Sequence, residues 1–217
     1  MFPFPFGFIG SGEVIPDLEL ISNDYAMEFN GTDEYTSAPN SMSALTGLSV
    51  SAWVKPTATG TGAAEAILST EAALPNRGFY LSLFVGSEFR WQVSTDGSNK
   101  DSLDAGTIVL NEWTHIVATW DQSTMNLYVN GSLADTMSTV NATGTFSTTN
   151  NMFIGQRTSG AGFFPGDLDE VAVWNKVLSA GDAQTIYNST NNNPGKCANL
   201  FTGGLGSGLV YWNRMGD

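Results

Sequence analysis

The sequence predicts an all-β fold, a sandwich of two antiparallel sheets with one short helix near the C-terminal end. Three observations lead to this prediction. Short runs of alternating apolar residues recur along the chain between polar turns, which is typical of sandwiches. Two of these turns carry hairpin signals. A helical period occurs in only one segment, close to residue 180.

The first clear strands lie between residues 48 and 95. The run LSVSAWVK is apolar at every second position from Leu48 to Val54, so one face of that strand should be buried. The runs FYLSLFV and FRWQVST flank Gly86 and Ser87. This arrangement predicts a hairpin.

Two further strand runs follow, WTHIVATW at residues 113–120 and MNLYVNGSLADT at residues 125–136. The second contains Asn130-Gly131 between two strand patterns, which is a strong signal for a tight hairpin. The residues expected to be buried share apolar identity and strand alternation: Leu48, Val50, Ala52, Val54, Val117, Leu127, Val129, Val171 and Val173.

The helix is predicted to begin after Ser179. Ser179 and Asp182 have the spacing of a capping box, in which each side chain bonds the other's backbone N–H. Ala183, Ile186 and Tyr187 then share one side of the helix, which should pack on the sandwich.

The composition divides the chain into a domain at residues 23–189 and two extended arms, at residues 1–22 and 190–217. The first arm begins MFPFPFGFIG, which has no positively charged start and is interrupted by Pro3 and Pro5. It therefore does not resemble a Sec signal peptide. The second arm is polar and then rich in glycine.

The N-terminal arm carries exposed aromatic side chains on a backbone that proline keeps out of helices. Phe2, Phe4, Phe6 and Phe8 are expected to dock onto a partner chain, by adding a strand to a sheet edge or by filling pockets. The protein is accordingly expected to be oligomeric, with both arms contacting other chains of a larger particle.

Charge and cysteine content exclude several classes of partner. The net charge is −13 and the eight Lys and Arg residues are scattered, so nucleic acid is not expected to bind. No apolar run approaches the roughly 18 residues that span a bilayer, so no membrane insertion is expected. Cys197 is the only cysteine, which excludes an intrachain disulfide.

Several segments in order resemble a known family: AMEFNGTDEYTSAP, LSVSAWVKP, LNEWTHIVATWD with LYVNG, and GDLDEVAVWNKVLSAGDAQTIYN. Together, over about residues 23–189, they resemble the laminin G-like, pentraxin-related branch of the concanavalin A-like lectin/glucanase superfamily. The resemblance implies a jelly-roll sandwich, commonly with a structural calcium. It also implies binding of glycans, proteins or cell surfaces, with catalysis confined to certain branches.

The chain departs from the catalytic branches, so no catalytic residues are assigned. Glucanases of this superfamily carry E-x-D-x-E on one strand, which sets two carboxyl groups about 5 Å apart, and no such triplet occurs here. The expected function is a noncatalytic binding or assembly module. The alternatives are a glycoside hydrolase or lyase, or a secreted lectin or adhesin.

The end of the chain, LVYWNRMGD, resembles the ending of laminin G-like proteins from marine phages. Together with the two arms, this resemblance favours a virion structural protein, such as a capsid-associated, decoration or fibre component, that binds surface glycans. The expected location is the virion or the extracellular space.

The run GDLDEVAVWN raises the question of what compensates Asp169. Strand alternation places Asp169 on the same face as Val171 and Val173, and burying an unpaired carboxylate costs several kcal/mol. Either a calcium ion compensates it, or it accepts hydrogen bonds from backbone N–H groups or a neighbouring arginine.

The family resemblance points to calcium. An acid on the late D-E-V strand commonly meets backbone carbonyls near the start of the domain. Here the carbonyls would come from Asn30 and Gly31, joined by the side chain of Asp33, since calcium takes oxygen ligands.

Loop aromatics are the expected glycan ligands, namely Phe163 and Phe164 in SGAGFFPGD and Phe79 after PNRG, although each could equally plug the end of the sandwich. His115 is expected to be a hydrogen-bonded core residue. The sandwich core is also expected to contain Trp53, Trp91, Trp113, Trp120 and Trp174.

Overall fold

A computed structural model describes residues 17–39, 42, 44–71, 78–146, 150–157 and 160–217. The predicted docking residues Phe2, Phe4, Phe6 and Phe8 lie outside the described residues.

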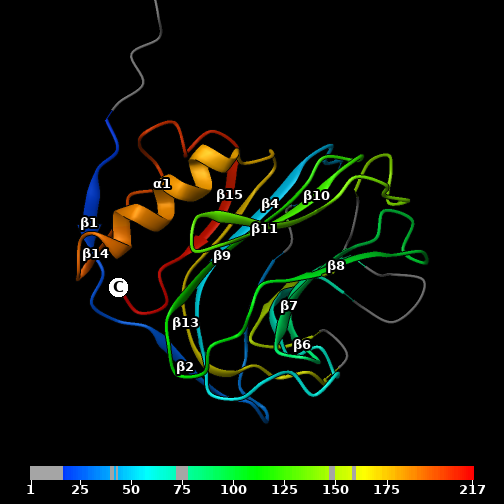
Figure 1. The fold of residues 1–217 in the computed structure, drawn as a ribbon, viewed down its shortest axis with the longest axis horizontal. Coiled ribbons are helices and arrows are strands. Elements are labelled where there is room, and N and C mark those ends of the chain that lie inside the picture. Colours follow the sequence, from blue (N-terminus) through cyan, green and yellow to red (C-terminus); the bar gives the residue numbers. More distant parts are fainter. Residues whose placement is uncertain (1–16, 40–41, 43, 72–77, 147–149, 158–159) are drawn as a thin grey trace, which may run out of the picture.

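As predicted, the described residues form two antiparallel sheets that face each other, and one short helix (Figure 1). They also form a separate two-stranded sheet, which was not predicted. One sheet has the order β11-β10-β9-β4-β13-β15, with β2 also paired to β13. Its strands are β2 (Met27–Asn30), β4 (Leu48–Pro56), β9 (Thr114–Trp120), β10 (Met125–Val129), β11 (Ser132–Met137), β13 (Pro165–Trp174) and β15 (Leu209–Asn213). The other has the order β3-β12-β5-β6-β7-β8. Its strands are β3 (Thr36–Ala38), β5 (Ala66–Ser69), β6 (Phe79–Phe84), β7 (Glu88–Val93), β8 (Asp101–Ala105) and β12 (Met152–Ile154).

The main hydrophobic core lies between the two sheets. Trp91 and Trp120 are fully buried in it, together with the alternating face of β4 that begins at Leu48. Of the residues predicted to be buried, Val129 is half-buried and the others are buried. Val117 packs in a different cluster, on the outer face of the β4 sheet.

That second cluster forms where α1 (Ala180–Asn191) covers the outer face of the β4 sheet (Figure 1). The predicted capping box is present, because Ser179 and Asp182 bond each other's backbone N–H groups. Ala183 and Ile186 are buried against Val117 and its neighbours. Within the described residues, no helix has the length and apolarity needed to cross a membrane.

Both predicted hairpins form. β6 pairs with β7, and β10 pairs with β11 through Asn130 and Gly131, whose φ values are 50° and 75°. Positive φ at both turn residues matches a type I′ turn, whose twist suits the paired strands.

The prediction of an extended C-terminal arm at residues 190–217 is wrong. β14 (Lys196–Ala198) pairs with β1 (Leu20–Ser22), and β15 pairs with β13 in the large sheet. The apolar side chains of Leu200 and Leu205 are buried in the cluster beneath α1. The polar, glycine-rich composition of this segment therefore reflects tight turns between short strands.

The predicted orientation of Asp169 is also wrong, because β13 contains a β-bulge there. Between the pairs Asp169–Trp53 and Ala172–Ser51, β13 has two residues where β4 has one. An extra residue reverses the alternation of faces. Leu168 and Val171 consequently both face the core, while Asp169 faces outward.

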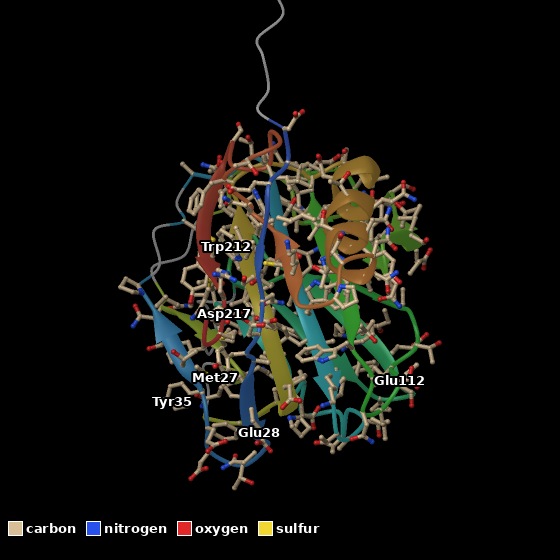
Figure 2. The ribbon with its side chains drawn as sticks, turned by 90° about the vertical axis from the view of Figure 1, so that its left-hand side faces the viewer. Met27, Glu28, Tyr35, Glu112, Trp212 and Asp217 are labelled. Atoms are coloured by element: carbon tan, nitrogen blue, oxygen red, sulfur yellow. The ribbon has the colours of Figure 1, made fainter. Side chains whose placement is uncertain are left out.

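The bulge coincides with a gap in strand pairing. β2 and β15 lie end to end along the same edge of β13: β2 begins opposite Leu168, and β15 ends opposite Val171. Figure 2 labels Trp212 of β15, Asp217 and Met27 of β2 in that order down the view, with Asp217 between the two strands. On this edge of β13, the backbone of Asp169 and Glu170 therefore needs partners other than a neighbouring strand.

Candidate functional site

A row of three side chains crosses the outer face of the large sheet. Cross-strand register places Asp169 of β13 opposite Trp53 of β4, and Trp53 opposite His115 of β9. Neighbouring strands lie about 4.8 Å apart, so the three side chains are direct neighbours. The carboxylate therefore lies beside an indole ring.

Asp169 and Trp53 of this row form one side of a cavity of about 340 Å³. The segment between β1 and β2, the loop before β9 and the C-terminal end of α1 supply the remaining walls. The lining residues are Asn23, Asp24, Tyr25, Ala26, Trp53, Trp113, Asp169, Tyr187, Thr190 and Asn191.

Aromatic rings dominate these walls. Trp53 stacks on Tyr187 of the helix with ring centroids 5.8 Å apart and ring planes at 21°. Trp113 and Tyr25 are more open, with 40% and 66% of their surfaces exposed. The cavity therefore combines a covered aromatic pair with two accessible rings.

Buried polar atoms at the cavity lack hydrogen-bond partners. They are the indole Nε1 of Trp53, the amide Oδ1 of Asn23 and the hydroxyl of Thr190. A buried donor or acceptor left unpaired costs about 1–3 kcal/mol. Because these atoms have almost no exposed surface, a ligand would bond to them, and recover that free energy, only after a small side-chain shift.

Asp169 is only 5% exposed. Its Oδ2 accepts from the side-chain amide of Asn23 at 2.9 Å, and its Oδ1 accepts from the backbone N–H of Glu170 at 2.7 Å. The pKa of Asp169 is raised from 3.8 to about 7, mainly by burial and also by the nearby Glu170 and Asp217, although both hydrogen bonds oppose the shift. The carboxylate thus satisfies the backbone N–H of the bulge.

His115 lies in the floor beneath these rings. It is fully buried, and its Nε2 lies 2.9 Å from the hydroxyl of Ser51. Desolvation lowers its pKa from 6.5 to about 3. The prediction of a hydrogen-bonded core histidine is confirmed, and the Ser51–His115 pair is inaccessible to substrate.

Residues of the C-terminal segment bind the second residue of the bulge region, Glu170. Glu170, whose φ is 51°, accepts from the indole N–H of Trp212 at 2.7 Å and pairs with Arg214 at 3.3 Å. Arg214 also donates to the backbone carbonyl of Ser22. Desolvation raises the pKa of Glu170, while Trp212 and Arg214 favour its charged form. This cluster attaches β15 to both β13 and β1.

The predicted calcium ligands are not brought together. Asn30 pairs with Pro165, four residues from Asp169 and so about 13 Å along the strand. The side chain of Asn30 instead caps its own turn, accepting from Thr32 N and Asp33 N and donating to the carboxylate of Asp33. Within the described chain, no three His, Cys, Asp or Glu side chains form a metal-binding group.

Two of the three predicted glycan ligands are wrong. Phe79 and Phe164 are fully buried, and Phe79 packs on Trp91 and Phe146 with centroids 5.6 Å apart. Both rings plug the sandwich interior, so neither can contact a sugar. Phe163 is half-buried.

Two of the aromatics at the cavity, Trp53 and Trp113, were predicted to lie in the sandwich core. Trp113 is not buried, and Trp53 lies on the outer face. The signal was present, because Trp53 alternates out of phase with Val50, Ala52 and Val54 on the same strand. Its closeness to Tyr25 and Tyr187 required the fold.

The acidic residues of β13 have separate partners. Asp167 pairs with Lys55 at 2.9 Å, Asp169 bonds Asn23, and Glu170 bonds Trp212. A glycosidase needs two carboxyl groups on opposite sides of one bond. These three acids do not have that arrangement.

Comparisons with known proteins agree with this architecture. A laminin G family model, described as the concanavalin A-like lectin/glucanases superfamily, matches residues 30–184. No curated protein matches the sequence.

Three solved structures illustrate the likeness. The heptameric SAP-like pentraxin of Limulus polyphemus is 22% identical with a TM-score of 0.58, over 76% of this chain and 82% of that chain. A putative carbohydrate binding protein of Bacteroides ovatus is 14% identical with a TM-score of 0.66, over 91% of this chain but only 53% of that one. Domain 4 of the arabinanase AbnA of Geobacillus stearothermophilus, solved with arabinotriose, is 18% identical with a TM-score of 0.58, over 77% and 79% of the two chains.

Proposed function

Because the chain belongs to the concanavalin A-like lectin/glucanases superfamily, we propose that it is a noncatalytic carbohydrate-binding module whose ligand enters the cavity beside Asp169. One observation carries the proposal. Accessible aromatic rings and buried, unpartnered polar atoms line the same cavity. Sugars have both an apolar ring face and a rim of hydroxyl groups, so they match both features.

Trp113 and Tyr25 are the proposed platforms, because their exposed rings can pack against the C–H face of a sugar. The indole N–H of Trp53 and the amide oxygen of Asn23 are the proposed hydrogen-bonding groups. Pockets that fix a ligand with a few polar groups among apolar walls are typical binding sites. The Bacteroides ovatus protein is a putative carbohydrate binding protein, and the Geobacillus domain was solved in complex with arabinotriose, which supports the same ligand class here.

The noncatalytic assignment rests on the separate bonding of Asp167, Asp169 and Glu170 and on the burial of His115. A structural calcium remains an expectation of the family resemblance. Such an ion would need ligands other than the set Asp169, Asn30, Gly31 and Asp33.

A glycan array followed by calorimetry tests the binding function. The wild type should bind a defined glycan, and Trp113→Ala should weaken that binding. Phe201→Ala is the matched control, because Phe201 is 70% exposed but lies away from the cavity. Release of reducing ends from any bound glycan would contradict the noncatalytic assignment.

We further propose that the protein acts as a structural component of a larger particle, such as a virion. The apolar run MFPFPFGFIG and the ending WNRMGD support this role. A chain lacking residues 1–12 should fail to join particles purified from the native source. Equal occupancy of particles by the shortened chain would favour the secreted lectin or adhesin instead.

A further inference from the structure

The cavity is acidic. Asp169 lies in its wall and Asp24 at its exposed rim, and the lining described above contains no Lys, Arg or His. Two cations near the cavity are paired with other acids. Lys55 lies 5.9 Å from the centre of the Trp113 ring but is paired with Asp167, and Arg214 is paired with Glu170.

The carboxylate of Asp169 has spare hydrogen-bonding capacity. A carboxylate can accept about four hydrogen bonds, and two are supplied here, by the neutral donors Asn23 and Glu170 N–H. Its charged neighbours, Glu170 and Asp217, are both acids. A buried carboxylate without a cation is costly, so a positive charge in the cavity would be favoured.

The aromatic walls favour the same kind of ligand. The faces of Trp and Tyr rings attract cations as well as apolar C–H groups. Trp113 and Tyr25 are the open rings, and Trp53 lies directly beside Asp169 in the sheet register. A ligand with a sugar ring and a positive group would use the rings and the carboxylate together.

We infer that the cavity selects an amino sugar with a free, protonated amine, whose ammonium group bonds Asp169 while its ring packs on Trp113 and Tyr25. This inference rests on the proposed function, and it names the class of sugar. The bond between the ammonium group and the carboxylate is charge-assisted, which makes it stronger than a bond to a hydroxyl or an acetamide. Sugars bearing carboxylates are disfavoured by the same charge.

Three tetrasaccharides with the same β-1,4-linked backbone provide the test, because they differ at carbon 2. Chitosan tetraose carries amines, chitin tetraose carries acetamides and cellotetraose carries hydroxyls. At neutral pH we expect calorimetry to show chitosan tetraose binding about tenfold or more tighter than the other two. Added salt should weaken this binding and leave cellotetraose binding unchanged.

Two variants test whether the preference for chitosan tetraose depends on the carboxylate of Asp169. Asp169→Asn should reduce the ratio of the chitosan and cellotetraose affinities to near one. Asp135→Asn, the same change at an exposed position of β11 outside the cavity lining, should keep the ratio of the wild type. The salt dependence of the wild type gives an independent answer if Asp169→Asn folds poorly.

The outcomes separate the two proposals. Equal or weaker binding of chitosan tetraose, while other glycans bind, would overturn the amino-sugar assignment and leave the carbohydrate-binding function standing. Absence of binding to all three and to a broad glycan array would overturn both.

Discussion

Replacing Asp169 by asparagine should change how stability depends on pH. In the folded chain the pKa of Asp169 is raised by burial from 3.8 to about 7. The folded state therefore holds this proton more tightly than the unfolded state. The resulting stabilisation is fully present below about pH 4 and is lost as the pH rises to about 7.

The magnitude follows from the shift. Between pH 8 and pH 5, protonation of Asp169 should add about 2.5 kcal/mol to the free energy of unfolding of the wild type. His115 has the opposite effect on the pH dependence of stability, because its pKa in the folded chain is lowered to about 3. Below about pH 6.5 the histidine of the unfolded chain takes up a proton that the folded chain does not, and this destabilises the fold. The wild-type profile alone will consequently be nearly flat.

The difference between wild type and Asp169→Asn isolates the carboxylate, since His115 is present in both. Urea unfolding at pH 5, 6, 7 and 8 gives the free energy of unfolding of both proteins. The value for the variant, relative to the wild type, should rise by about 2.5 kcal/mol between pH 5 and pH 8, which corresponds to about 5–10 °C in Tm. A difference that stays constant from pH 5 to pH 8 would refute the reasoning, because it would mean that the carboxyl titrates near its ordinary pKa.

Three further predictions concern other contacts. Arg214→Ala should lower the free energy of unfolding by about 2–3 kcal/mol in denaturant melts, because it removes the cation paired with the buried carboxylate of Glu170. A loss below about 0.5 kcal/mol would indicate an exposed, screened pair. Gly131→Ala should lower the free energy of unfolding by about 1–3 kcal/mol. The reason is that Gly131 has a φ of 75° and a Cβ there would lie 3.1 Å from the ring of Tyr187. An unchanged Tm would contradict this packing. EGTA should shift the Tm of wild type and Asp169→Asn equally, because Asp169 is bonded to Asn23 and Glu170; a shift confined to the wild type would restore Asp169 as a calcium ligand.

Much of the fold was predictable because it depends on local patterns. Alternation along β4, positive-φ turn residues at Asn130-Gly131 and the capping box at Ser179 each involve residues close together in the sequence. The family resemblance joined these elements into one sandwich. The C-terminal strand β15 was missed because its partner, β13, lies about 40 residues earlier and its flanking glycines resemble a linker.

By itself the sequence determined the sandwich, its core faces and the acidity of the chain, because alternation, turn propensity and charge are properties of neighbouring residues. It also singled out Asp169 as an acid that needs compensation. Only the tertiary structure decided how Asp169 is compensated. A bulge is a mismatch between two paired strands, so its position in β13, and the outward turn that it gives Asp169, depend on the register with β4. The cavity likewise combines residues from the segment before β2, from β4, from the loop before β9, from β13 and from the end of α1, and no local pattern specifies that these five segments meet.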